Sequence, residues 1–139
     1  MAASSAVAHG GAVLGHGLDV VDINDFSRLL KQPAIGFLDR YFTDGELLAA
    51  GQGANRLEKL AGRFAIKEAV MKALGVGWGD GVAFTDVEVV TLQTGAPRVM
   101  LHRTLAALQV ARGISDLLVS SSHAGSVAIA SVIAIGRCQ

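Results

Sequence analysis

Hydrophobic residues between Asn55 and Gly75 recur at steps of three and four positions, a spacing that predicts a long helix with one apolar face. The apolar positions are Leu57, Leu60, Ala61, Phe64, Met71 and Leu74. Glu68 interrupts this face near its middle, and Lys72 follows one turn later. A carboxylate on a core-facing stripe loses its hydration, so Glu68 needs a partner such as a cation or a metal ion.

A second stripe on the same predicted helix is basic. Its members, at three- and four-residue steps, are Arg56, Lys59, Arg63 and Lys67. Two interpretations are open. The carboxylate, the basic stripe and Lys72 together suit a metal-phosphate ligand. Alternatively, Glu68 and Lys72 form an ordinary ion pair worth about 0.2–0.5 kcal/mol, and the basic stripe is a solvated face.

The rest of the pattern predicts shorter elements around this helix. β-branched residues over 13–21 favour a strand, and Thr43 with Glu46 forms a capping box at the start of a helix. Two apolar runs, over 116–122 and 126–135, predict a buried antiparallel hairpin with His123 at its end. The other predicted elements are helices over 23–31 (ended by Pro33) and 102–112, an apolar segment over 37–42, and strands over 86–92 and 98–101.

Two aspartates mark the end of the first predicted strand. Asp19 lies inside its apolar run, and Asp22 follows three residues later. An aspartate at a strand end is a common metal ligand and equally a common helix N-cap. The residues alone favour the cap and leave the metal ligand open.

Composition limits the function classes. With 139 residues and 5% aromatic content, the chain is expected to form one domain with a core of small aliphatic side chains. Its formal net charge is zero, so no nucleic-acid partner is expected, and the apolar run over 127–135 is too short to span a membrane. The single cysteine, Cys138, excludes an intrachain disulfide and fits the reducing cytoplasm.

The first thirteen residues contain no Lys or Arg, which argues against a signal peptide. We expect a flexible extension over 1–13 and a single domain over 14–139, although part of the extension could begin the first strand.

Four stretches in order resemble the holo-[acyl-carrier-protein] synthases, the small trimeric group of 4′-phosphopantetheinyl transferases. Residues 60–75 are similar to the family's central helix almost residue for residue, and this match is specific on its own. The other three are Gly15-His16-Gly17-Leu18-Asp19, like the family's G-x-G-x-D opening; Gly95-Ala96-Pro97, where the family has G-K-P or G-R-P; and Ser120-Ser121-Ser122-His123, like its S-x-S-H.

The resemblance implies an α+β fold of antiparallel strands packed around the long central helix, assembled as a homotrimer with active sites between subunits. The expected reaction moves 4′-phosphopantetheine from coenzyme A to a serine of apo-acyl carrier protein and releases adenosine 3′,5′-bisphosphate. Asp19 and Glu68 match the family's ligands for Mg²⁺, and Lys72 matches its lysine near the diphosphate; these are the expected catalytic residues. The residues expected to bind coenzyme A are Arg63, Lys67, Gly75, Gly77 and His123.

The chain departs from the family where the carrier protein docks. The family often has a basic residue soon after its opening motif, but this chain has Asn24 and Asp25 there. The nearest substitutes for docking an acidic acyl carrier protein are Arg28, Lys31 and Arg40. The alternative function is a non-catalytic trimeric coenzyme A binding protein, and a third is a structural domain whose charged helix is solvated. The general base, the carrier and its pathway, fatty acid or polyketide, stay open.

Overall fold

A computed structural model describes residues 11–32, 37–79 and 81–137. The elements in chain order are β1 (Ala12–Asp22), α2 (Ile23–Leu30), α3 (Phe37–Tyr41), α4 (Asp44–Ala50), α5 (Arg56–Leu74), the 3-10 turn η2 (Phe84–Asp86), β2 (Val87–Thr91), β3 (Pro97–Leu101), α6 (Arg103–Ala111), β4 (Ile114–Ala124) and β5 (Val127–Gly136). Pro33, Cys138 and the first ten residues, which hold most of the expected extension, lie outside the described residues. In the described ranges, no helix combines the length and apolar character needed to cross a membrane.

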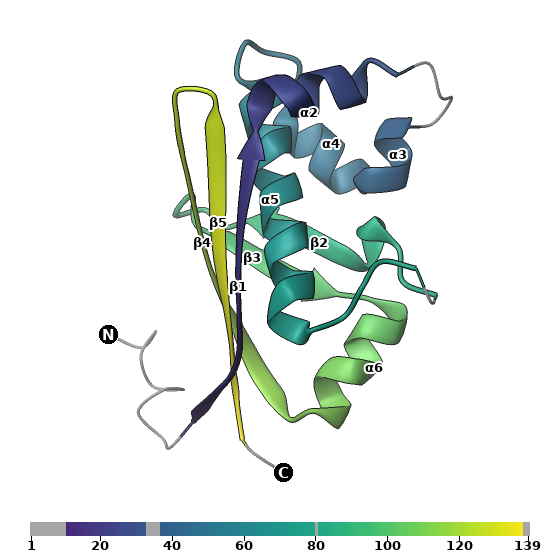
Figure 1. The fold of residues 1–139 in the computed structure, drawn as a ribbon, viewed down its shortest axis with the longest axis vertical. Coiled ribbons are helices and arrows are strands. Elements are labelled where there is room, and N and C mark those ends of the chain that lie inside the picture. Colours follow the sequence, from purple (N-terminus) through teal and green to yellow (C-terminus); the bar gives the residue numbers. More distant parts are fainter. Residues whose placement is uncertain (1–10, 33–36, 80, 138–139) are drawn as a thin grey trace.

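The long helix α5 runs along one face of a three-stranded antiparallel sheet (Figure 1). Strand β5 is central in this sheet and pairs with β1 on one side and β4 on the other. Strands β2 and β3 form a second, two-stranded antiparallel sheet. Figure 1 shows α2, α3 and α4 around one end of α5 and α6 near its other end. This is the predicted α+β arrangement of antiparallel strands around a central helix.

The glycines of the opening motif let α5 rest directly on the backbone of β1. A Cβ atom on Gly17 would lie 1.9 Å from the Ala69 carbonyl oxygen, and one on Gly15 would lie 2.1 Å from the Ala73 carbonyl oxygen. Side chains at either position would push the helix off the strand, because real Cβ atoms do not approach so closely. The motif is therefore explained by helix–strand packing, and it sets the separation between β1 and α5.

Small aliphatic side chains fill the interface between α5 and the sheet. Ala61, Ala65 and Ala69 are fully buried at four-residue steps on α5, and they face inward-pointing residues of β5 such as Ala130 and Val132. The helix is also buried on other sides, because α2, α4 and β2 pack against it. The prediction of a single apolar face therefore understates how enclosed this helix is.

One expectation from the sequence needs correction. The β4–β5 hairpin forms, but only its inner face is buried: Leu118 and Ile129 on the outer face are 42% and 37% exposed. An antiparallel sheet packed on one face leaves the other open, so apolar runs alone do not establish burial on both faces. His123 lies at the end of the hairpin as predicted, as the penultimate residue of β4, and β1 begins at Ala12, which agrees with the alternative that part of the extension begins the first strand.

Candidate active site

Three residues predicted to be catalytic lie together where β1 crosses α5. Asp19 is on the inner face of β1, and its carboxylate Oδ1 accepts a hydrogen bond from Lys72 Nζ at 3.0 Å. The same ammonium donates to the Leu18 carbonyl at 2.9 Å. Lys72 therefore pairs with the strand, and the predicted alternative of an ion pair within the helix between Lys72 and Glu68 is wrong.

Glu68 is half-buried beside this pair. Its Oε2 accepts a hydrogen bond from Trp78 Nε1 at 3.2 Å. Burial raises the pKa of the Glu68 carboxyl, and the nearby charge of Asp19 raises it further. The Trp78 hydrogen bond and the charge of Lys72 oppose this shift. The Asp19 carboxylate thus lies close enough to Glu68 to raise the pKa of the Glu68 carboxyl, an arrangement that a bound cation would relieve.

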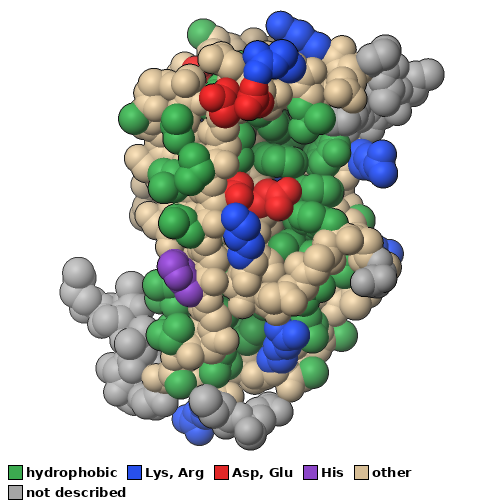
Figure 2. Space-filling view, in the orientation of Figure 1, with side chains coloured by type: hydrophobic (Ala, Val, Ile, Leu, Met, Phe, Trp, Pro, Cys, Tyr) green, Lys and Arg blue, Asp and Glu red, His purple; other side chains and the backbone are tan. Residues whose placement is uncertain are grey.

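The pair fits a magnesium ion. Asp19 and Glu68 both line an open cavity of about 430 Å³ between β1, α2 and α5. No group of three His, Cys, Asp or Glu side chains in the described part of the chain could hold a metal ion. Mg²⁺ usually keeps several waters and uses only one or two carboxylates together with substrate phosphates, so two carboxylates are a sufficient protein contribution. Figure 2 shows acidic and basic side chains next to one another in the middle of this face, bordered by hydrophobic ones.

Apolar side chains also line this cavity. Phe26 and Leu29 come from α2, and Phe64 comes from α5, one turn before Glu68. The carboxylates of Asp22 and Asp25 are also in its lining. Asp22 is the N-cap of α2, because its side chain accepts a hydrogen bond from the Asp25 amide at 3.0 Å. The cap prediction is thus confirmed for Asp22, whereas Asp19 faces the cavity.

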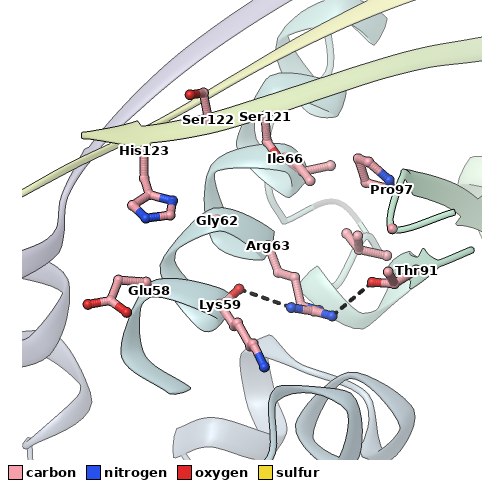
Figure 3. A pocket seen from close by; sticks show the side chains of 12 residues that line it. Glu58, Lys59, Gly62, Arg63, Ile66, Thr91, Pro97, Ser121, Ser122 and His123 are labelled. Carbon is pink, nitrogen blue, oxygen red and sulfur yellow. Dashed lines mark hydrogen bonds between the residues drawn. The ribbon is translucent and has the colours of Figure 1, made fainter. Parts of the chain in front are cut away.

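A second cavity of about 210 Å³ lies between the first half of α5, the β2–β3 sheet and the end of β4 (Figure 3). Figure 3 shows His123 and Glu58 at one end of it, Pro97 and Thr91 at the other, and Arg63 between them. The Arg63 guanidinium donates to the Thr91 hydroxyl at 3.1 Å and to the Lys59 carbonyl at 3.2 Å. Its Nε has no hydrogen-bond partner among the described residues. Burial lowers the pKa of Arg63.

Lys67, predicted to bind coenzyme A, lies elsewhere. Its side chain is fully buried and forms an ion pair with the equally buried Glu46 at 2.8 Å. It also donates to the carbonyls of Phe84, at 3.0 Å, and Val87. An ammonium enclosed by a carboxylate and two carbonyls has no donor to offer a ligand, so the structure contradicts this prediction. It equally contradicts a solvated basic face at Lys67.

The remaining predicted residues line neither cavity. Gly75 is the left-handed C-cap of α5, with φ of 66°, and Gly77 is exposed. Arg28, Lys31 and Arg40 are exposed near α2 and α3, and Arg28 forms an ion pair with Asp25. The sequence did not assign Trp78 to the site. Its contact with Glu68 spans ten residues and leaves no local pattern in the sequence.

The two cavities share no lining residue. The carboxylate cavity lies at the β1 edge of the sheet, and the cavity with Arg63 and His123 lies at the β4 edge. One chain therefore does not bring all the predicted site residues into one place.

Known proteins match this chain over most of its length. A profile described as the 4′-phosphopantetheinyl transferase superfamily matches residues 15–130. The chain belongs to this superfamily.

Individual members of the superfamily agree with this assignment. The transferase chain is 36% identical over 121 residues to the holo-[acyl-carrier-protein] synthase of Solibacter usitatus, covering 87% of this chain and 97% of that protein. The crystal structure of the synthase from Neisseria meningitidis matches with a TM-score of 0.80 at 32% identity, over 88% of this chain and 98% of that one. The Helicobacter pylori synthase in complex with coenzyme A matches with a TM-score of 0.75 at 30% identity, over 86% and 98% of the two chains. The predicted resemblance and fold class are confirmed.

Proposed function

We propose that the chain is a holo-[acyl-carrier-protein] synthase. It transfers 4′-phosphopantetheine from coenzyme A to a serine hydroxyl of apo-acyl carrier protein and releases adenosine 3′,5′-bisphosphate. The observation that carries this proposal is the Asp19–Glu68 pair beside Lys72 at an open cavity, in a chain that aligns with synthases over 87% of its length.

Asp19 and Glu68 would hold Mg²⁺, since both carboxylates face one cavity. When bound, the ion would neutralise charge on the diphosphate and on the departing bisphosphate. Lys72 keeps its ammonium beside Asp19 at the edge of this cavity, where it would stabilise the negative charge of the leaving phosphate.

The Arg63 cavity would bind the nucleotide end of coenzyme A. Arg63 is held by Thr91 and Lys59, and a guanidinium fixed in this way suits phosphate recognition. The exposed His123 at the other end of the cavity supplies a second nitrogen group for the ligand. Gly75 and Gly77 would let the loop after α5 approach coenzyme A.

A homotrimer would complete the site. Because the two cavities lie at opposite edges of the sheet, the carboxylates of one subunit would meet the Arg63 cavity of another. The acyl carrier protein would dock on α2 and α3. There Arg28, Lys31 and Arg40 are exposed, and Phe26 and Leu29 border the cavity.

The test is the intact mass of an apo-acyl carrier protein after incubation with this protein and coenzyme A, with Mg²⁺ or with a chelator. We expect a gain of one phosphopantetheine that requires Mg²⁺. Glu68→Gln is the matched variant: it keeps the Trp78 hydrogen bond through its amide oxygen, should keep the fold, and should lose the transfer. If several carriers gain no mass while coenzyme A still binds, the chain is a coenzyme A binding protein instead.

A further inference from the structure

Trp78 is the only tryptophan of the chain, and its indole N–H points at a carboxylate of the site. It lies in the loop after α5, and its Nε1 donates to Glu68 Oε2 at 3.2 Å. Glu68 has no other hydrogen bond to a described side chain in the structure. Lys72, the nearby cation, donates its hydrogen bond to Asp19 instead. The orientation of the Glu68 carboxylate therefore depends on this one donor.

The indole ring itself is held in place by aromatic stacking. It lies on the ring of Phe84, with centroids 3.8 Å apart and planes inclined by 18°. Phe84 stacks in turn on Phe64, with centroids 5.5 Å apart and planes inclined by 13°. Phe64 is on α5, one turn before Glu68. The stack thus connects the loop back to the helix that carries the carboxylate.

The buried lysine fixes the far side of this stack. Lys67 Nζ donates to the Phe84 carbonyl at 3.0 Å, and its charge is balanced by Glu46 at 2.8 Å. The backbone of η2 is therefore attached to the same helix as Glu68. The Glu46–Lys67 pair therefore supports the site structurally, by holding Phe84, and does not bind coenzyme A itself.

We propose that Trp78 is a positioning residue that sets the affinity of the site for Mg²⁺. The terminal torsion of a glutamate is broad, so an unrestrained carboxylate rotates freely. The indole N–H holds Oε2 and so fixes the plane of the carboxylate. Groups that orient metal ligands in this way typically change metal affinity by about 10–100-fold when removed. The inference rests on the proposed function only in taking Glu68 as a ligand of Mg²⁺.

Isothermal titration calorimetry of Mg²⁺ into the 139-residue protein saturated with coenzyme A tests the proposal. Trp78→Phe keeps an aromatic ring on Phe84 but removes the N–H donor. We expect about a tenfold or greater loss of Mg²⁺ affinity, with an unchanged circular dichroism spectrum. Transfer by this variant should recover at saturating Mg²⁺, whereas Glu68→Gln should not recover. Leu117→Ala, a truncation of a partly buried side chain on the edge strand β4 that is not in the lining of the carboxylate cavity, should leave the affinity unchanged.

Tryptophan fluorescence gives a readout on the unaltered protein. Mg²⁺ added with coenzyme A should change the emission of Trp78, and Glu68→Gln should abolish that change. Wild-type Mg²⁺ affinity in Trp78→Phe, or Mg²⁺ binding to the unaltered protein with no change in emission, would overturn the proposal while leaving the transferase function intact. Absence of Mg²⁺ binding to the unaltered protein would instead remove the proposed metal site itself.

Discussion

Lys67 and Glu46 form an ion pair in the interior of the protein, so the charge of each side chain is balanced by the other. Both side chains are fully buried, and the Glu46 carboxylate also accepts hydrogen bonds from the amides of Thr43 and Val89, each at 2.8 Å. Burial lowers the pKa of Lys67, and the charge of Glu46 opposes this. A buried pair with these additional hydrogen bonds ties α4, α5 and β2 to one another.

Removing one partner of this pair should be costly. Lys67→Met leaves the Glu46 carboxylate buried without a counter-charge, so we expect the free energy of unfolding to fall by about 3–5 kcal/mol. Urea denaturation measures this change. The double variant Lys67→Met with Glu46→Gln should recover part of the loss, since no unpaired charge remains. A loss below about 1 kcal/mol in the single variant would mean that water reaches the pair.

At the scale of elements, the contact between β1 and α5 determines where the site forms. The helix rests on the strand at Gly15 and Gly17, and two residues further along the strand Asp19 meets Lys72. Glycine-rich motifs often bind phosphate, but here the two glycines allow the backbone of α5 to pack against β1. The glycines of the motif serve the packing of helix on strand, whereas Asp19 lines the cavity of the proposed active site.

The two glycine environments of α5 and β1 provide a matched pair of substitutions. Gly17→Ala would place a Cβ 1.9 Å from the Ala69 carbonyl oxygen, so the helix must shift. We expect a loss of at least 3 kcal/mol in the free energy of unfolding, near the upper end for single substitutions. Gly62→Ala, inside α5 and with no atom beyond the local helix backbone within 4 Å of the new Cβ, should stabilise the fold by about 0.5–1 kcal/mol. Thermal denaturation followed by circular dichroism distinguishes the two; equal melting temperatures would contradict the direct contact.

Local signals predicted the elements well. The capping box of Thr43 and Glu46 forms as expected, and α5 ends at the left-handed Gly75. These features depend on neighbours a few residues away, which the sequence displays directly. That Glu68 and Asp19 lie at the same cavity was predicted only through the family resemblance.

Contacts between distant segments were not predictable from spacing. Lys67 follows Arg63 by one turn and so resembles a residue on a solvated basic face, but Glu46 of α4 lies against it. The Trp78 contact with Glu68 likewise depends on how the loop after α5 folds back. A period of three to four residues reports which face a side chain occupies, and not which other element covers that face.

At the scale of the whole molecule, the sheet exposes apolar side chains, among serines, on one face. On the side away from α5, Leu18, Val20 and Ile129 are 49%, 59% and 37% exposed. Neighbouring exposed apolar side chains of this kind are typical of an interface with another chain. A second copy is the proposed occupant, because it would also bring the Arg63 cavity of one subunit to the carboxylates of another.

A charge on this face should separate the subunits. Ile129→Glu on the central strand would place a carboxylate in the proposed interface, so we expect a monomer at micromolar concentration in analytical ultracentrifugation, against a trimer for the unaltered protein. The variant should stay folded, as judged by circular dichroism, but should lose transfer. Leu48→Glu, at the 83% exposed Leu48 of α4, is the control and should remain trimeric. A trimer that persists in Ile129→Glu would place the interface elsewhere.

The direct backbone contact between α5 and β1 also affects how the protein can be redesigned. The distance between strand and helix at Gly15 and Gly17 is set by main-chain atoms, and no side-chain volume enters it. Core residues further from this contact, such as Leu60 and Leu105, can then be exchanged for others of similar volume without altering the spacing between Asp19 and Glu68. A library that randomises the aliphatic core but preserves these two glycines should therefore yield many stable and active sequences.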